Sequence, residues 1–428
     1  MTRFRAIAWS VALPLAACAQ SDSEPDPVAA DPISVESRFT NVTWMTAPTG
    51  EVFLLDTGSP RTQVIPEVLG LADNVFDEVI WDDPFGFNVD RQAVLASGDL
   101  PLFLKAVPGF SGIIGADMLS RRPFIVDTHG GEVVLGEISP SEVMERYDVE
   151  PPSVVPIEVL GGSRTCFTMG CIEWEANRII VPVTIDGVAS FGVVDTGMGN
   201  VTVSGEFFER HLAERPVPSF EMEDLVDPQF TQAAPVVMIH TLAERLVIGD
   251  LGEQDVRLDI PPRAAGLDAA LSRLSVEVGV KVEVLLGNSL FARFLTQVDY
   301  EAQELRLYRY RESHPTVGRL EGTSVFASES VGGVGFSDAP IGGTYDGRCL
   351  YAVRAVVGGE GSELGLADAE SCFLSIAGFD ATDSDRLAEL PGYLDGLAVG
   401  DPVEVTVAQP DGEPNVVTLH VQQHLARP

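Results

Sequence analysis

The tripeptide Asp-Thr-Gly occurs twice in this chain, each time at the end of an apolar run. The first copy stands in EVFLLDTGSP at Asp56, and the second stands in SFGVVDTGMG at Asp195. Downstream, SGIIGADML and EVLLGNSL each bring apolar residues to a glycine, Gly115 or Gly287, and an aspartate follows that glycine after 12 residues in both copies, at positions 127 and 299. A duplicated strand-and-turn unit with matched spacing predicts two structurally similar lobes.

The two copies differ in length. The tripeptide and the downstream glycine lie 59 residues apart in the first copy (56 to 115) and 92 apart in the second (195 to 287), a difference of 33. The extra residues cover much of FEMEDLVDPQFTQAAPVVMIH and an expected helix around LDAALSRL. We expect an asymmetric pair of lobes, with the insertion in the second.

The pattern along the chain predicts a mainly β protein. Short Val/Ile/Leu/Phe-rich runs are separated by Gly, Pro, Asp and Asn, which is typical of strands joined by turns. We expect a first lobe over residues 35–145, a second over 155–310 and a linker at 149–156. Short helices are expected in SEVMERY, GEFFERHLAER and LDAALSRL. A third unit, residues 320–425, combines strands with two short helices and closes on a hairpin around Pro410-Asp411-Gly412.

The first residues indicate a secreted, lipid-anchored protein. Arg3 and Arg5 precede an apolar run over residues 6–17, which is typical of a signal peptide and too short to span a bilayer. Leu15-Ala16-Ala17-Cys18 resembles a bacterial lipobox, which implies cleavage before Cys18 and its acylation; an ordinary signal peptide with an incidental Cys18 is the alternative. Residues 18–34 are small and acidic, which suits a solvated tether. We expect a location in the bacterial cell envelope, facing the periplasm, and Ala19 favours the outer membrane if the rule of enteric bacteria applies.

The other four cysteines would then lie in an oxidising compartment. Two disulfides are possible, and Cys166–Cys171 with Cys349–Cys372 is the simplest local pairing. Buried free thiols are the alternative, because buried cysteine packs as a small hydrophobe.

Charge and motif content exclude several classes of function. The net charge of −37 would repel nucleic acid and anionic membrane surfaces. The six histidines are scattered without metal-ligand spacing, and the sequence contains neither a Gly-x-Ser-x-Gly elbow nor a phosphate-binding glycine loop. We therefore expect no metal and no cofactor.

Two aspartates pressed together are suited to hydrolysis. They cannot both ionise readily, so they share a proton, and the pair offers a base for water and an acid for the carbonyl oxygen. The neighbouring residues have positioning roles: Gly58 and Gly197 allow close backbone approach, and Thr57 and Thr196 can hydrogen-bond across a pseudo-twofold axis. Ser59 could support the first carboxylate, whereas Met198 holds the matching place in the second copy.

Residues 35–310 resemble the retropepsin/pepsin-like aspartic peptidases, in particular bacterial members with two retropepsin-like lobes fused in one chain. The resemblance implies a bilobal acid-protease fold, Asp56 and Asp195 as the catalytic pair, and Gly115 and Gly287 in a supporting apolar-apolar-Gly motif. It also implies a cleft for an extended polypeptide. No tyrosine lies between Asp56 and Gly115, so the flap tyrosine of pepsins is absent and the flap residues stay unassigned. Inert turns, or a fold that has lost activity, are the alternatives.

The third unit resembles a PDZ domain, a small α/β sandwich, of the kind attached to bacterial proteases. Gly333-Val334-Gly335-Phe336 looks like its carboxylate-binding loop, which implies a protein C-terminus as ligand. Glu370-Ser371 replaces the usual Gly-Asp pair, and a glycine-rich turn without ligand is the alternative. Two functions follow as hypotheses: an envelope aspartic endopeptidase, or an inactive scaffold that holds peptides with the PDZ-like unit and the interlobe cleft.

Overall fold

The computed structural model describes most of the chain after residue 32. The described residues are 33–37, 42–72, 76–87, 93–97, 100, 109–128, 130–160, 163–167, 170–174, 177–214, 219–224, 236–262, 266–311, 329–337, 349–366, 371–387, 389–394, 396–408 and 413–423. Over these residues the protein is mainly β, as the sequence predicts. None of its described helices is both long and apolar enough to span a membrane. The predicted signal peptide, Cys18 and most of the tether lie outside the described residues.

The first lobe is built of short strands around the first Asp-Thr-Gly. They are β1 (Ile33–Ser37), β2 (Thr43–Thr46), β3 (Val52–Leu55), β4 (Gln63–Val64), β5 (Phe76–Ile80), β6 (Ala93–Ser97), β7 (Phe110–Ile114), β8 (Phe124–Asp127) and β9 (Glu132–Leu135). Its helical elements are η1 (Pro66–Leu69), α2 (Ala116–Leu119) and α3 (Pro140–Tyr147). The helix α3 begins at a capping box between Ser139 and Glu142, which explains why SEVMERY is helical.

The second lobe repeats this plan with longer strands. They are β11 (Glu158–Leu160), β12 (Ser163–Phe167), β13 (Gly170–Trp174), β14 (Arg178–Ile185), β15 (Val188–Val194), β16 (Val201–Val203), β17 (Ser219–Asp224), β18 (Val236–Ile248), β19 (Leu251–Ile260), β20 (Val282–Leu286) and β21 (Phe294–Asp299). Its helices are α4 (Gly205–His211), α5 (Leu267–Val278) and α6 (Asn288–Phe291).

The sheet order shows the internal repeat directly. The first lobe has the order β3-β7-β4-β6-β5, and the second has β15-β20-β16-β19-β18. The strand before each Asp-Thr-Gly is parallel to the strand before each glycine (β3 with β7, β15 with β20), and β4–β6 and β16–β19 are also parallel. In the second lobe β17 is added beyond β18, with no counterpart among the described residues of the first lobe. Both β17 and α5 fall within the 33-residue excess.

A sheet shared by both lobes joins them. Its order is β10-β22-β21-β8-β9-β1, where β10 is Ser153–Pro156 and β22 is Glu304–Arg309. The terminal strands of the two copies, β8 and β21, are antiparallel neighbours. The segment 149–156, expected as a linker, therefore also contributes a strand.

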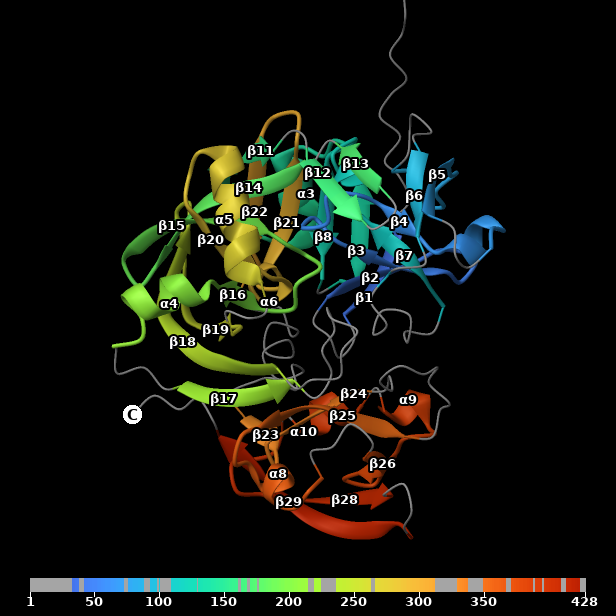
Figure 1. Ribbon diagram of the computed structural model, residues 1–428, viewed down its shortest axis with the longest axis vertical. Coiled ribbons are helices and arrows are strands. Elements are labelled where there is room, and N and C mark those ends of the chain that lie inside the picture. Colours follow the sequence, from blue (N-terminus) through green and yellow to red (C-terminus); the bar gives the residue numbers. More distant parts are fainter. Residues whose placement is uncertain are drawn as a thin grey trace, which may run out of the picture.

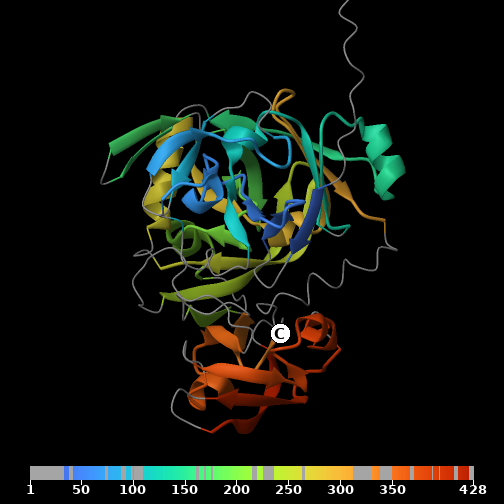
Figure 2. The ribbon, with the colours of Figure 1, turned by 90° about the vertical axis from the view of Figure 1, so that its right-hand side faces the viewer.

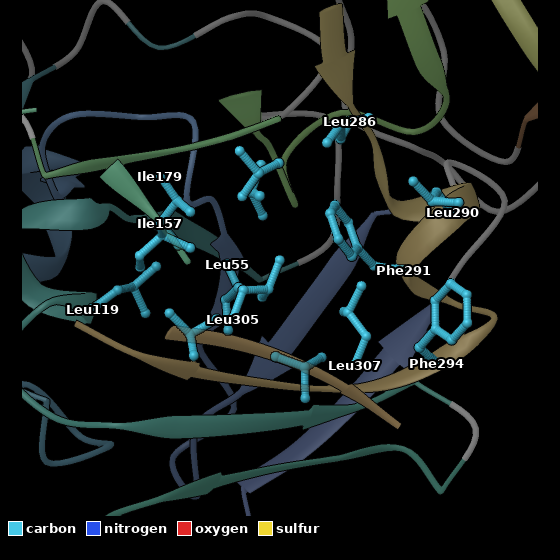
Figure 3. Close-up of a cluster of buried hydrophobic side chains, with 14 of the residues drawn as sticks. Leu55, Leu119, Ile157, Ile179, Leu286, Leu290, Phe291, Phe294, Leu305 and Leu307 are labelled. Carbon is cyan, nitrogen blue, oxygen red and sulfur yellow. The ribbon is translucent and has the colours of Figure 1, made fainter. Parts of the chain in front are cut away.

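One apolar core runs through both lobes. Figure 3 shows side chains from the two copies packed together, among them Leu55 of β3 and Leu286 of β20. Leu305 and Leu307 of the shared sheet belong to the same cluster. Each fully buried side chain of this kind contributes about 1.5–3 kcal/mol. The turns that follow Leu55 and Val194 are thus anchored on a continuous core.

A C-terminal unit, residues 329–423, has a core of its own. Its elements are β23 (Glu329–Val331), β24 (Val334–Ser337), β25 (Leu350–Val356), α8 (Glu360–Glu363), β26 (Cys372–Ile376), β27 (Phe379–Asp380), α9 (Ser384–Leu387), α10 (Leu390–Leu394), β28 (Pro402–Ala408) and β29 (Asn415–Gln423). The core includes Phe336 and Phe373, whose rings pack edge to face with their centroids 4.8 Å apart. Figures 1 and 2 show this unit, orange to red, as a body below the two lobes.

A disulfide cross-links two segments of this unit. Cys349, just before β25, forms a disulfide with Cys372, the first residue of β26. In the second lobe the backbone of Cys166 is paired with that of Cys171 across β12 and β13, but their side chains lie outside the described part. The residues at the tip of the hairpin between β28 and β29, expected around Pro410-Asp411-Gly412, are also outside it.

Candidate active site

Asp56 and Asp195 stand at equivalent places in the two lobes. Asp56 directly follows β3 and donates its backbone N–H to the Ile114 carbonyl oxygen of β7 at 3.0 Å. Asp195 directly follows β15 and donates to the Leu286 carbonyl oxygen of β20, also at 3.0 Å. Each aspartate is therefore fixed between two parallel strands, one that ends at the Asp-Thr-Gly and one that ends at the downstream glycine.

The two threonines join the turns reciprocally. The backbone N–H of Thr57 donates to Thr196 Oγ1 at 3.1 Å, and that of Thr196 donates to Thr57 Oγ1 at 3.1 Å. The hydroxyls in turn donate across the lobes, Thr57 to the Val194 carbonyl oxygen and Thr196 to the Leu55 carbonyl oxygen, each at 2.8 Å. Both side chains are buried. These bonds place the two Asp-Thr-Gly turns face to face.

Each carboxylate lies over the glycine of the other turn. A Cβ on Gly58 would stand 2.3 Å from the carboxyl carbon of Asp195, and one on Gly197 would stand 2.3 Å from that of Asp56. No side chain fits at such distances, so the glycines are required by space rather than by backbone angle. The two carboxyl groups are also close enough that each alters the pKa of the other. The geometry thus brings the predicted pair together.

Comparisons with known proteins add little to this geometry. No protein-family model matches the chain, and no curated protein matches it. Among solved structures, it is similar to a retropepsin-like aspartic protease from Rickettsia conorii, with 16% identity over 37% of this chain and 96% of that one, at a TM-score of 0.21. It is also similar to Basic 7S globulin from soybean, with 11% identity over 64% of this chain and 95% of that one, at a TM-score of 0.32. Because both TM-scores are low, the fold rests on the strand pairings and hydrogen bonds given above.

The two aspartates have unequal surroundings. Asp56 Oδ1 accepts the backbone N–H of Gly58 at 2.9 Å and that of Ser59 at 2.8 Å, whereas Asp195 Oδ1 accepts only the N–H of Gly197, at 3.1 Å, among the bonds described. The Ser59 hydroxyl, expected to support the carboxylate, donates instead to the Arg61 carbonyl oxygen at 2.9 Å. Its main chain supplies the support that we expected from its side chain.

This inequality decides where the shared proton resides. Burial raises the pKa of both carboxyl groups. At Asp56 the N–H bonds of Ser59 and Gly58 oppose the rise in pKa. At Asp195 the negative charge of Asp56 adds to burial and raises the pKa well above its ordinary value of 3.8. The pair titrates as a unit, with the proton favoured on Asp195 and the charge on Asp56.

Arg178 is a site residue that the sequence did not reveal. Its Nε–H donates to the Gly58 carbonyl oxygen at 3.0 Å, and its positive charge lowers the pKa of both aspartates. Leu54 and Val193 each stand two residues before their aspartate, and they pair with Trp44 and Ile180 of the neighbouring strands. Val42 and Arg178 each stand two residues before these partners, so Val42 is the first-lobe position equivalent to Arg178. At this pair of equivalent positions the cation is therefore present in the second lobe only. No sequence signal marks it, because arginines are common at strand ends.

Gly115 and Gly287 support the turns from behind. A Cβ on Gly115 would lie 2.4 Å from the Arg61 carbonyl carbon, and one on Gly287 would lie 2.1 Å from the Asn200 carbonyl oxygen. Arg61 and Asn200 each follow their aspartate by five residues. The apolar-apolar-Gly motif therefore packs directly on the backbone of the loop after each Asp-Thr-Gly.

A buried polar cluster continues from Asn200 into the second lobe. Asn200 donates its Nδ2–H to Asp259 Oδ2 at 2.9 Å, and His240 Nδ1 lies 2.6 Å from Asp259 Oδ1. Arg257 donates to the same oxygen of Asp259 at 3.2 Å. Asn200, His240 and Asp259 are all buried. The cluster links the loop after Asp195 to β18 and β19.

The four residues predicted as a carboxylate-binding loop divide between a turn and a strand. Gly333 has a φ of 75° in the turn after β23, whereas Val334, Gly335 and Phe336 belong to β24. Val334 and Phe336 are buried in the core of the C-terminal unit. In the described part of the chain no group of His, Cys, Asp and Glu residues could hold a metal ion.

Proposed function

We propose that this protein is an aspartic endopeptidase that hydrolyses peptide bonds with a water molecule held between Asp56 and Asp195. The observation that carries the proposal is the reciprocal placement of each carboxylate over the glycine of the opposite turn. The buried threonine bonds fix that placement, and a rigid pair within hydrogen-bond reach is what activation of water requires.

The unequal pair suggests the assignment of roles. Ionised Asp56 takes a proton from water while protonated Asp195 gives its proton to the carbonyl oxygen, and the water oxygen bonds to the carbonyl carbon. Asp56 then passes its proton to the amide nitrogen, the C–N bond breaks, and Asp195 regains its proton from the diol. The reaction consumes one water, and both carboxyl groups return to their initial state. No cofactor takes part.

The test is cleavage of a denatured protein and a peptide library between pH 3 and 8. We expect the wild type and Asp250→Asn, which alters an exposed aspartate in the turn between β18 and β19, to cleave alike. Asp56→Asn and Asp195→Asn should each lose about 1,000-fold or more in kcat/KM. If all four proteins leave the substrates intact, the endopeptidase proposal is wrong and the scaffold alternative stands, to be tested by peptide binding.

We further propose that the C-terminal unit is a PDZ-like module that receives protein C-termini along β24. Its order of strands and short helices and the glycine turn before β24 support this proposal. Peptides with a free carboxylate should bind more tightly than their amidated forms. Equal binding of both forms would contradict it.

The cellular location is also a proposal. We infer attachment to the periplasmic side of the bacterial envelope through acylated Cys18, with polypeptides as substrates. Cys18→Ser should move the protein from the membrane fraction to the soluble fraction. Membrane retention of Cys18→Ser at the wild-type level would contradict the lipid anchor.

A further inference from the structure

The C-terminal unit is joined to the second lobe by a strand pairing. β17 and β25 are antiparallel neighbours, with Met222 opposite Val356, Glu223 opposite Ala355, and Asp224 opposite Arg354. Beyond the end of β25, the backbone N–H of Val357 donates to the Glu221 carbonyl oxygen at 3.0 Å. One sheet of 15 strands therefore runs from the second lobe into the C-terminal unit, as Figure 1 shows where yellow-green β17 meets the orange domain.

β17, beyond β18, has no counterpart among the described strands of the first lobe. Without β25, residues 222–224 of β17 would pair only with residues 236–238 of β18, because β19 pairs with β18 from Ile239 onward, and two strands without a further neighbour are marginally stable in water. An uncovered edge also presents unpaired backbone groups. The pairing with β25 supplies the missing neighbour.

The hairpin of β17 and β18 is physically connected to the candidate active site. Phe220 of β17 is paired with His240 of β18, and His240 lies against Asp259 of β19. Asp259 accepts the side-chain N–H of Asn200 at 2.9 Å. Asn200 is the residue whose backbone packs on Gly287 behind the second aspartate. Order in the hairpin is therefore linked through three buried side chains to the loop after Asp195.

We propose that the C-terminal unit is a clamp that orders the β17–β18 hairpin and, through the cluster around Asp259, the second half of the active site. The ordering itself is independent of the proposed function; the effect on peptide cleavage rests on it. A peptide that adds to β24 would lie on the same sheet as β17 and would be separated from it by two strands, β24 and β25, because β24 is the neighbour of β25. Such a ligand would act on the hairpin through β25.

Hydrogen-deuterium exchange on the full chain tests the clamp. Val357→Pro removes the N–H that bonds to Glu221, and Val357→Ala is the matched control because it shortens the same exposed side chain and keeps the N–H. In Val357→Pro the amides of residues 219–224 and 236–240 should exchange about tenfold faster, as expected for the loss of roughly one backbone hydrogen bond. Val357→Ala should match the wild type. Unchanged exchange in Val357→Pro would overturn the clamp.

A second variant acts in the opposite direction. Because Glu221 and Val357 form a hydrogen-bonded pair, Asp224 and Arg354 form a non-hydrogen-bonded pair, whose Cα atoms approach to about 4.5 Å, within disulfide range. Asp224→Cys with Arg354→Cys should cross-link spontaneously and restore slow exchange in the Val357→Pro background. Failure to cross-link, or cross-linking without restored protection, would overturn the clamp.

Activity is measured separately. Val357→Pro should lower kcat/KM for peptides about tenfold relative to Val357→Ala, and the cross-link should recover it. The exchange measurements are repeated in Asp195→Asn, where no cleavage is expected. If no protein, including the wild type, cleaves peptides while the exchange rates change as expected, the endopeptidase proposal is wrong and the clamp stands. Wild-type activity in Val357→Pro together with faster exchange would refute the link from the hairpin to the active site.

Discussion

Arg178 Nε donates a hydrogen bond to the Gly58 carbonyl oxygen at 3.0 Å, so a strand of the second lobe holds the Asp-Thr-Gly turn of the first. Arg178→Met removes both this bond and a positive charge near the aspartates. A hydrogen bond to a charged group stabilises by about 1.5–3 kcal/mol, and the free energy of unfolding should fall by about that amount.

Arg178→Met should also change the pH dependence of cleavage. The guanidinium lowers the pKa of Asp56 and of Asp195. Its loss therefore raises both pKa values, and the whole profile of kcat/KM should move to higher pH. Arg178→Lys keeps the charge and should leave the profile closer to that of the wild type. A shift to lower pH in Arg178→Met would contradict the electrostatic role.

Thr57→Val should weaken the contact between the lobes. The substitution removes the hydroxyl that donates to Val194 and accepts from the Thr196 N–H. Leaving buried groups without partners costs about 1–3 kcal/mol each, so we expect about 2–5 kcal/mol of destabilisation by denaturant unfolding. Thr57→Ser retains the hydroxyl and is the control. A loss in Thr57→Ser as large as that in Thr57→Val would contradict the dominant role of the hydroxyl.

Asp195→Asn should stabilise the protein at neutral pH. The folded-state pKa of Asp195 is raised above 3.8, so its contribution to stability is fully present below that value and is lost as the pH rises through the folded pKa. An asparagine does not titrate, and the variant should gain on the order of 1 kcal/mol or more at pH 7 but little at pH 3. Thermal unfolding at the two pH values, with Asp250→Asn as the control, measures this difference. A larger gain at pH 3 would contradict the raised pKa.

Gly287→Ala should destabilise the second lobe. The added methyl group would stand 2.1 Å from the Asn200 carbonyl oxygen, which is main chain and cannot rotate away. Overpacking of this kind costs about 1–3 kcal/mol or more. Gly192→Ala in β15 is the control, because its Cβ would approach only the Leu286 side chain, at 3.0 Å. Comparable losses in the two variants would contradict the special role of Gly287.

The repeat explains how much of the site could be predicted. Asp56, Asp195 and their threonines and glycines are marked by a motif, and the motif positions them because a buried strand ends directly before each aspartate. The prediction for Ser59 assigned the carboxylate contact to the hydroxyl, whereas the backbone N–H makes it. The direction of the backbone in a turn decides which of these two groups faces the carboxylate. Arg178 could not be found, because its nearness to Gly58 arises from packing between the lobes.

The pairing of strands that lie far apart in the chain was the other feature that the sequence could not predict. The residues opposed in β17 and β25 are 130 to 134 positions apart, and strand patterns indicate that a strand exists without indicating its neighbour. The segment 149–156 shows the same limit, since its prolines suggested a linker and its partner β22 lies far along the chain.

The two lobes of this chain have different sequences, so each can change by mutation without the other, which is not possible in a symmetric dimer. In a twofold dimer one substitution changes both walls of the cleft at once. Here Val42 and Arg178 hold equivalent strand positions with opposite character, and Val42 is buried in an apolar cluster of the first lobe. A substitution of Arg178 can therefore alter the acidity of the aspartate pair while the packing around Val42 stays unchanged, so these two properties can vary independently.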